Sequence, residues 1–389
     1  MQLAFPYRGW MILLVSLGGL WLVSYLWARS LVRNLSLSRE MRFGWAHVGD
    51  QLEERFTLTN RGLIPALWVE IIDHTTMPDY STSRVTGIEG KSQNRWHTHG
   101  LCTRRGIFTL GPTTLTTGDP FGLYTVTLHQ PDASTLTVTP PIVPLPVIEV
   151  APGGRAGEGR SRANPFEKTV SSIGIRKYIP GDSLNQIHWP TSARQGEIYV
   201  RQFESTPPGD WWRFLDLDEY IQVGQGFNST EEHSIILAAS LADRGLKMGK
   251  AVGLVSHGES LVWLPPDDSD NQRHQIMRAL AQIVPGPVSL TSLLSQSRPD
   301  QLRAASLILI TANASGNWLT GLLPLRQRGA IPTVLLLDPA TFDGPLGIGA
   351  VESTLVELGI AHTIITKDVL DRPEARPGQA GQWEWQISP

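Results

Sequence analysis

The sequence has little cysteine and little net charge. Cys102 is the one cysteine among 389 residues, which excludes an intrachain disulfide and a cysteine-rich zinc module and suits a reducing compartment. The 33 Lys and Arg residues nearly balance the 36 Asp and Glu residues, giving a formal charge of −3. Because such a balance offers no general attraction to a polyanion, we expect no nucleic-acid partner.

Catalytic motifs are also missing. No Ser, Cys, His and Asp residues follow the spacing of a known hydrolase, and the glycine-rich residues 153–160 lack the Gly-Lys-Ser/Thr of a phosphate-binding loop. If His97, His99 and Cys102 lie on one strand, the histidines share a face that excludes the cysteine, and two ligands make no closed metal site. We predict that the protein is not an enzyme and holds no resident cofactor.

The one long apolar run lies near the N-terminus. Residues 10–28 carry no charge, and a helix of that length covers about 28 Å of a hydrocarbon core about 30 Å thick. A cleaved signal peptide is the alternative, but bulky Leu26 and Trp27 before Ala28 make a poor cleavage site. We predict a retained membrane anchor over residues 1–34, with the span at about 10–28.

Basic residues around this span predict its orientation. Arg29, Arg33, Arg39 and Arg42 follow it, whereas Arg8 and the terminal amine precede it. Since positively charged flanks remain on the cytoplasmic side, we expect a single-pass protein of the plasma membrane whose C-terminal domains face the cytoplasm. Arg29 and Arg33 are four residues apart on a continuing helix and would alternatively meet anionic lipid phosphates, but we favour the topogenic interpretation.

Residues 35–147 consist of short alternating segments separated by turns. Apolar and polar residues alternate in 51–60, and the triplets 60–62 and 118–120 are rich in Asn, Asp, Gly and Pro. This pattern predicts a β-sandwich. The next stretch, 148–172, is too rich in glycine and charge to enter a core and is predicted to be a linker.

Residues 205–380 follow a different pattern, in which apolar runs alternate with helical segments. The continuous runs 307–310 and 334–337 are typical of central strands buried on both faces of a parallel sheet. Only residues 258–259 separate two further strands, which is too short for a crossover helix and predicts a hairpin. We therefore expect a multidomain protein whose α/β domain has a mixed sheet, followed by a tail at 381–389.

Residues 173–204, between the two units, contain a dense set of turn-forming and charged residues. Pro180 and Gly181 suit a type II turn, and Asp182 is placed to cap a short helix through His188. Alternation from residue 197 onward predicts a strand. The arginines of this segment suit ion pairs with its carboxylates; the competing interpretation is a docking face for a partner.

The same segment resembles the bacterial family called domain of unknown function 58. The agreement in order and spacing is carried by Arg176, Tyr178, Pro180, Gly181, Asp182, Ile187, His188, Trp189, Ser192, Ala193, Arg194, Gly196, Val200, Arg201, Phe203 and Glu204. The resemblance extends over essentially the whole chain. It implies an N-terminal anchor, an immunoglobulin-like β domain and a C-terminal domain similar to von Willebrand factor A domains.

The resemblance also implies partners. Its members keep genetic and physical company with MoxR-type AAA ATPases and other von Willebrand factor A proteins, in systems that mature or insert metals into partner proteins. We therefore expect a non-enzymatic adaptor or assembly factor that uses the signature residues as its interaction surface.

A von Willebrand factor A fold implies a cation site of the form Asp-x-Ser-x-Ser, completed by a Thr and an Asp from other loops. Here Asp216 and Asp218 lack the hydroxyl companions, and Ala312-Asn313 stands where the last Asp is expected. Oxygen ligands from these two carboxylates could still hold Mg²⁺ in another geometry. The alternative is that a basic residue, Arg194 or Arg213, neutralises them.

Two further functions stay open. One is a metal-dependent adhesion module with its degenerate site completed by a ligand oxygen, with Ser289 or Thr291 as loosely matched protein ligands. The other is a cell-envelope protein that faces outward and takes part in surface assembly.

Overall fold

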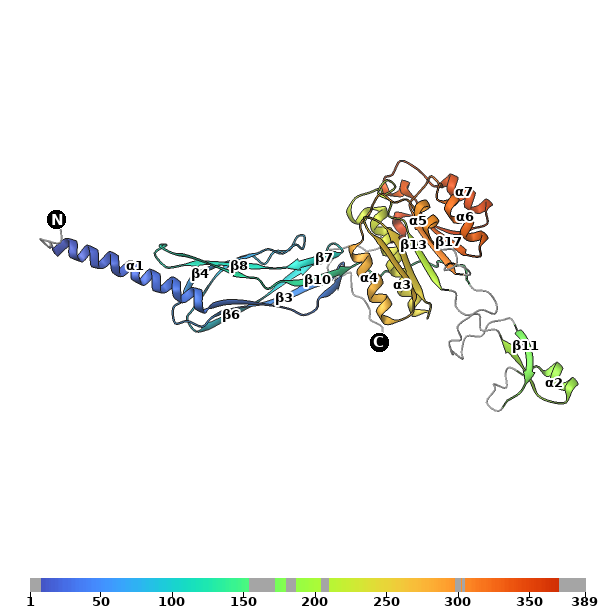
Figure 1. The fold of residues 1–389 in the computed structure, drawn as a ribbon, viewed down its shortest axis with the longest axis horizontal. Helices are drawn as coiled ribbons and strands as arrows, with labels where there is room; N and C mark the ends of the chain where they lie inside the picture. The colour runs from blue at the N-terminus through green and yellow to red at the C-terminus, as the bar shows by residue number, and fades with distance from the viewer. Residues whose placement is uncertain are drawn as a thin grey trace. The chain divides into compact units, whose positions relative to one another are not determined.

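The computed structural model describes residues 8–153, 172–179, 187–203, 210–297, 302 and 305–370 (Figure 1). Within these ranges the chain forms two compact units, and the boundary between them lies after Pro141. The first unit contains the N-terminal helix and a β-sandwich. The second contains the α/β domain.

The N-terminal helix α1 (Arg8–Asn34) is long and apolar enough to cross a membrane. Most of its apolar side chains are exposed, but Ser24, Ala28 and Leu31 are buried. Leu31 belongs to the core of the following sandwich. The last three turns of α1 are therefore part of the sandwich rather than a free tether.

The sandwich is built from ten strands in three hydrogen-bonded groups, ordered β1-β3-β6, β2-β10-β7 and β5-β4-β8-β9. The bounds are β1 (Leu35–Met41), β2 (Trp45–His47), β3 (Gln51–Asn60), β4 (Ala66–Asp73), β5 (Arg84–Ile88), β6 (Ser92–Leu101), β7 (Gly106–Leu110), β8 (Thr113–Gly118), β9 (Thr125–Gln130) and β10 (Ser134–Thr139). One apolar cluster joins β1 and β3 to β4 and β8, and another joins β3 to β2 and β10. The β-sandwich expected from the alternating pattern is thus present.

A buried ion-pair network connects the two layers of the sandwich. Arg39 on β1 donates to Glu54 on β3 (Nε to Oε1, 2.6 Å) and to Asp73 on β4 (Nη1 to Oδ1, 2.8 Å). Tyr80 Oη also donates to Glu54 Oε2, at 2.6 Å. Because these charges are removed from water, they need all of these partners to be tolerated.

The boundary between the units lies earlier than the sequence suggested. Residues 142–153, expected to end the sandwich and begin a linker, lie along the α/β domain. The backbone N–H of Val143 donates to Ser240 Oγ (2.9 Å), and that of Gly153 donates to Ser306 Oγ (2.7 Å). Hydroxyls of the α/β domain replace water for these backbone groups, which is why the segment adheres to that domain.

The α/β domain has one six-stranded sheet in the order β15-β14-β13-β16-β17-β18. Its strands are β13 (Trp211–Leu215), β14 (Val252–His257), β15 (Leu261–Asp267), β16 (Ser306–Thr311), β17 (Ile331–Leu337) and β18 (Ala361–Ile365). All neighbours are parallel except β14 and β15. The mixed sheet with a hairpin at its edge is therefore confirmed.

Helices cover both faces of this sheet (Figure 1). They are α3 (Thr230–Lys247), α4 (Asp270–Gln282), α5 (Leu290–Gln296), α6 (Leu319–Gln327), α7 (Gly349–Glu357) and α8 (Lys367–Leu370), with short 3-10 helices at Gly226–Asn228 and Pro339–Phe342. Every residue of β13 and β16 is buried. Polar groups at the ends of these two central strands are consequently removed from bulk water.

Candidate functional site

The signature segment contains a hairpin whose strands flank a helix. β11 (Ser172–Lys177) pairs antiparallel with β12 (Tyr199–Phe203), with Arg176 opposite Val200. α2 (Trp189–Gln195) precedes β12. The predicted strand is confirmed, whereas the turn and most of the short helix predicted before residue 188 fall outside the described residues.

Two signature side chains connect α2 to its surroundings. His188 is the N-cap of α2, and its Nδ1 accepts from the backbone N–H of Thr191 at 3.3 Å. Ser192 Oγ accepts from the backbone N–H of Tyr199 (2.9 Å) and donates to the carbonyl oxygen of His188 (3.1 Å). Gly196 ends the helix at φ 70°, a left-handed conformation that favours glycine. His188, Ser192 and Gly196 thus have structural roles.

The hairpin exposes apolar side chains beside these residues. Trp189 is 67% exposed and Ile198 is 46% exposed. The backbone N–H of Tyr178 donates to the carbonyl oxygen of Ile198 (2.8 Å), which brings the two ends of the hairpin together. Arg194, also exposed, lies on α2 five residues after Trp189.

The other signature residues are described in part or lie outside the described ranges. Arg176, Arg201 and Phe203 lie on the paired strands, where their backbone positions are described. Pro180, Gly181, Asp182 and Glu204 lie outside the described residues. The ion pairs expected of Asp182 and Glu204 therefore remain predictions.

The acidic residues Asp216 and Asp218 follow the central strand β13, and both are buried. The neighbouring strand β16 ends at Thr311, whose Oγ1 donates to Asp216 Oδ2 at 2.6 Å. The backbone N–H of Asp218 donates to Asp216 Oδ1 at 3.3 Å. Thr311 was not identified as a site residue from the sequence, although a polar residue that directly follows the buried apolar run 307–310 could have been recognised as a candidate.

The protonation of Asp216 is set by opposing effects. Burial raises its pKa to about 7, while the hydrogen bonds from Thr311 and from the Asp218 backbone act to lower it. A carboxyl group with this pKa is partly protonated at neutral pH. Any cation binding here would have to displace that proton.

Other residues expected near these carboxylates are engaged elsewhere. Ser289 caps α5 by accepting from the backbone N–H of Ser292. Arg213, expected as a basic partner, donates to the carbonyl oxygens of Gly253 (3.1 Å) and Ala238. Among the residues that the structure describes, no three His, Cys, Asp or Glu side chains gather in a geometry that could hold a metal ion.

The histidines of β6 and the cysteine do not come together. His97 and His99 are exposed, and His97 Nδ1 lies 3.2 Å from Glu53 Oε1. Cys102 is fully buried, and burial raises the pKa of its thiol to about 12. A thiol in this environment is unreactive.

The fold and these sites define a class: a protein with an apolar N-terminal helix, a β-sandwich and an α/β domain with buried carboxyls at the end of its central strand. A family model described as "Protein of unknown function DUF58" matches residues 174–378. The match spans more than half of the chain, and the chain belongs to this family.

Relatives of this chain include bacterial proteins of low sequence identity. Uncharacterized protein Rv1480 of Mycobacterium tuberculosis is 22% identical over 211 residues, which are 53% of this chain and 66% of that protein. Uncharacterized protein YeaD of Bacillus subtilis is 24% identical over 302 residues, covering 74% of this chain and 73% of that protein. The chain thus spans just under two thirds of the length of the mycobacterial relative.

Solved structures similar to part of the chain have low scores. The CARDB domain of the PF1109 protein from Pyrococcus furiosus, in complex with di-metal ions, has a TM-score of 0.21 and 12% identity, covering 27% of this chain and 94% of that chain. The C-terminal domain of wzt has a TM-score of 0.20 and 12% identity, covering 27% and 71%. Similarity at this level supports no conclusion about function.

Proposed function

We propose that this protein is a membrane-anchored, non-enzymatic adaptor or assembly factor that binds a MoxR-type AAA ATPase and other von Willebrand factor A proteins. The observation that carries the proposal is the exposure of Trp189 on the signature hairpin. Tryptophan is enriched among the residues that dominate protein–protein binding energies. An indole held in water on a structured element is therefore suited to a partner.

Hydrogen bonds fix the backbone that carries Trp189. The hydrogen bonds of His188 and Ser192 fix the start of α2 against β12, so Trp189 projects from an ordered backbone. A preorganised anchor residue loses little conformational entropy on binding. Arg194 and the ion pair between Lys177 and Glu197 are exposed polar groups of the same segment, and polar groups are usual at the rim of an interface.

The proposal also includes the membrane topology of the chain and the identity of its two folded domains. The exposed apolar surface of α1 and the basic residues after it support a plasma-membrane span with the C-terminal domains in the cytoplasm. The six-strand order with an antiparallel edge supports a von Willebrand factor A-like domain, and the layered strands support an immunoglobulin-like sandwich. Tethering would raise the effective concentration of partners at the membrane.

Binding to a purified MoxR-type AAA ATPase from the same organism tests the proposal. We expect Trp189→Ala in the full-length protein to weaken binding about thirtyfold or more, because hot-spot truncations cost about 2 kcal/mol or more. Trp45→Ala is the matched control, since Trp45 is a similarly exposed tryptophan on the sandwich. Equal affinities for Trp189→Ala, Arg201→Ala and the native protein would refute the role of the signature segment.

Orientation is tested separately with reporters at the C-terminus. A fused green fluorescent protein should fluoresce, and a fused alkaline phosphatase should be inactive, if the C-terminal domains are cytoplasmic. The opposite pair of results would favour the outward-facing surface-assembly protein.

The contact between Thr311 and Asp216 favours a second candidate, the metal-dependent adhesion module. The hydroxyl of Thr311 and the backbone N–H of Asp218 both contact the Asp216 carboxyl group at the carboxyl end of the sheet. The Asp218 side chain is buried two residues further on, and hard cations require oxygen ligands such as these. Calorimetric titration of the full-length protein with Mg²⁺ separates the candidates. Tight uptake that is lost in Asp216→Ala and Asp218→Ala would favour this second function.

A further inference from the structure

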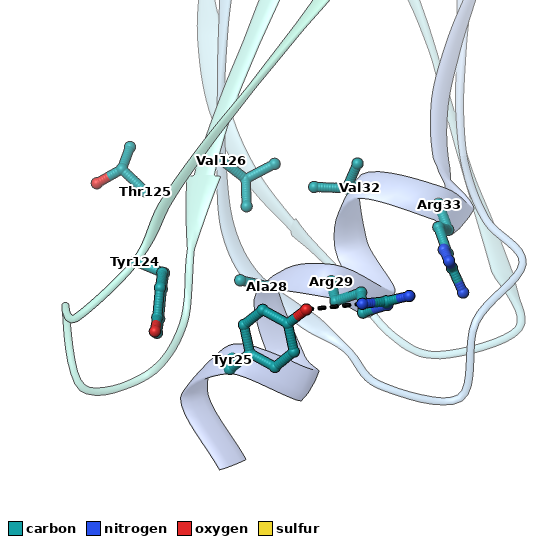
Figure 2. A pocket seen from close by; sticks show the side chains of 8 residues that line it. All are labelled: Tyr25, Ala28, Arg29, Val32, Arg33, Tyr124, Thr125 and Val126. Atoms are coloured by element: carbon teal, nitrogen blue, oxygen red, sulfur yellow. Dashed lines mark hydrogen bonds between the residues drawn. The ribbon is translucent and has the colours of Figure 1, made fainter. Parts of the chain in front are cut away.

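A groove lies where the end of α1 meets strand β9 of the sandwich (Figure 2). It has a volume of about 370 Å³ and is lined by Tyr25, Arg29, Val32 and Arg33 from the helix and by Tyr124 and Val126 from the sandwich side. The rings of Tyr25 and Tyr124 meet edge to face, with centroids 6.2 Å apart. The groove is thus a built junction within the first unit.

The polar side of this groove is basic. Arg29 and Arg33 lie four residues apart on α1, and Arg29 Nη1 donates to Tyr25 Oη at 2.6 Å. Figure 2 shows this bond, which holds the Arg29 guanidinium beside the Tyr25 hydroxyl. Within the described part of the chain, no acidic residue lines the groove or forms a salt bridge with either arginine. Two guanidinium groups without carboxylates suit a phosphate ligand.

The apolar side of the groove continues the lipid-facing surface of the helix. Val32 and Val126 face one another across it in Figure 2. The turn before Tyr124 exposes Phe121 and Leu123, which are 55% and 51% accessible. Side chains of this kind in water at a loop tip are favoured beside a bilayer rather than beside bulk solvent. A free phosphate ion would need none of this apolar surface.

The length of the helix places the groove at the bilayer surface. α1 becomes buried against the sandwich at Ser24, so the residues from Arg8 to Val23 are the part of the described helix free to lie in lipid. At about 1.5 Å per residue this part extends about 24 Å, less than a hydrocarbon core of about 30 Å. About four more residues cross the rest of the core, so the span ends near Ala28, where the uncharged run also ends. Arg29 and Arg33 therefore lie at headgroup depth, and Tyr25 lies near the interface, where tyrosine is also favoured.

We infer that the groove between α1 and β9 binds the phosphate headgroup of an anionic phospholipid, with Arg29 and Arg33 as the phosphate ligands. The inference rests on the proposed membrane anchoring of the chain. It assigns to these arginines a binding role in addition to topogenic charge. The lipid would also fix the sandwich against the membrane surface.

Native mass spectrometry of the full-length protein in detergent tests the inference. Phosphatidylglycerol and phosphatidylcholine with identical acyl chains are offered at equal concentration, and the retained lipid is counted. We expect preferential retention of phosphatidylglycerol, and a fall of about thirtyfold in that preference in the double variant Arg29→Gln/Arg33→Gln, because each of the two basic side chains contributes about 1 kcal/mol near an anionic surface. The double variant Arg29→Lys/Arg33→Lys should keep most of the preference.

Arg104→Gln is the matched control, because Arg104 is an exposed arginine at the opposite end of the sandwich, beyond the end of β6 that pairs with Gln51. An unchanged lipid preference in Arg29→Gln/Arg33→Gln, or an equal loss in Arg104→Gln, would overturn the inference. Complete competition by millimolar glycerol 3-phosphate would also overturn it in favour of a soluble phosphate ligand.

A separate experiment tests whether the chain is anchored in the membrane at all. Alkaline carbonate washing of membranes from cells that express the native chain should leave it in the pellet, as it should for the double glutamine variant. Release of the native chain would refute the anchor. Retention in the pellet without preference between the two lipids would refute the lipid site alone.

Discussion

Two opposing effects determine whether the buried carboxyl group of Asp216 is protonated. Burial at the end of β13 favours the neutral acid, whereas the hydrogen bond from Thr311 favours the carboxylate. The resemblance to von Willebrand factor A domains singled out Asp216 and Asp218 as a candidate cation site. The sequence did not predict the hydrogen bond between Thr311 and Asp216, because that contact depends on which strands are neighbours in the sheet.

Stability should depend on pH through Asp216. Its folded pKa of about 7 lies above the ordinary value of 3.8, so between these values the folded state holds a proton that the unfolded state has lost. The free energy of unfolding should therefore fall as pH rises from about 4 to 7, with the loss complete above pH 7. Urea unfolding of Asp216→Asn at pH 5 and pH 8 should show a smaller fall than the native protein.

The variant Thr311→Val should change the same pH dependence of stability in the opposite direction from Asp216→Asn. Without the hydroxyl that favours the carboxylate, the folded pKa of Asp216 should rise further, and the fall in stability should extend to higher pH. Parallel pH profiles for the native protein, Asp216→Asn and Thr311→Val would show that the charge of Asp216 makes no contribution.

At the scale of elements, the hydrophobic periodicity predicted most of the strands, but it did not predict where helix α2 begins. The alternation after residue 197 yields β12, and the short interval at 258–259 yields the antiparallel edge pair β14 and β15. The start of α2 was not predicted, because its cap is His188 rather than one of the common Ser, Thr, Asp or Asn caps. The exposure of Trp189 likewise depends on where that helix begins.

Ser192 should control the order of the signature hairpin. Its hydroxyl accepts from the Tyr199 N–H and donates to the His188 carbonyl, so Ser192→Ala removes bonds that join α2 to β12. Hydrogen exchange at the Tyr199 amide should accelerate about fivefold to tenfold, as expected for loss of about 1 kcal/mol. Ser295→Ala, which removes a bond from an exposed serine to its own helix, is the control; equal exchange at Tyr199 in both variants would contradict this role.

At the scale of the whole molecule, the sequence predicted an anchor and two folded units, but not how the anchor meets the first of them. The buried positions Ser24, Ala28 and Leu31 lie on one face of α1. The small side chains of Ser24 and Ala28 permit close packing of α1 against another element. This packing was not predicted, because the same apolar run also satisfies the length and composition of a membrane span.

The joint between anchor and sandwich should therefore behave as core rather than as linker. Leu31 is fully buried among side chains of the sandwich, while its neighbour Val32 is 51% exposed. Leu31→Ala should lower the free energy of unfolding of the sandwich by about 2–4 kcal/mol, because it leaves a cavity, whereas Val32→Ala should change it by less than about 1 kcal/mol. Urea unfolding of the full-length protein in detergent, followed by the fluorescence of Trp27 and Trp96 in the same cluster, measures both variants. A flexible tether would give equally small effects, so the difference between two adjacent residues decides whether the end of α1 is fixed to the sandwich.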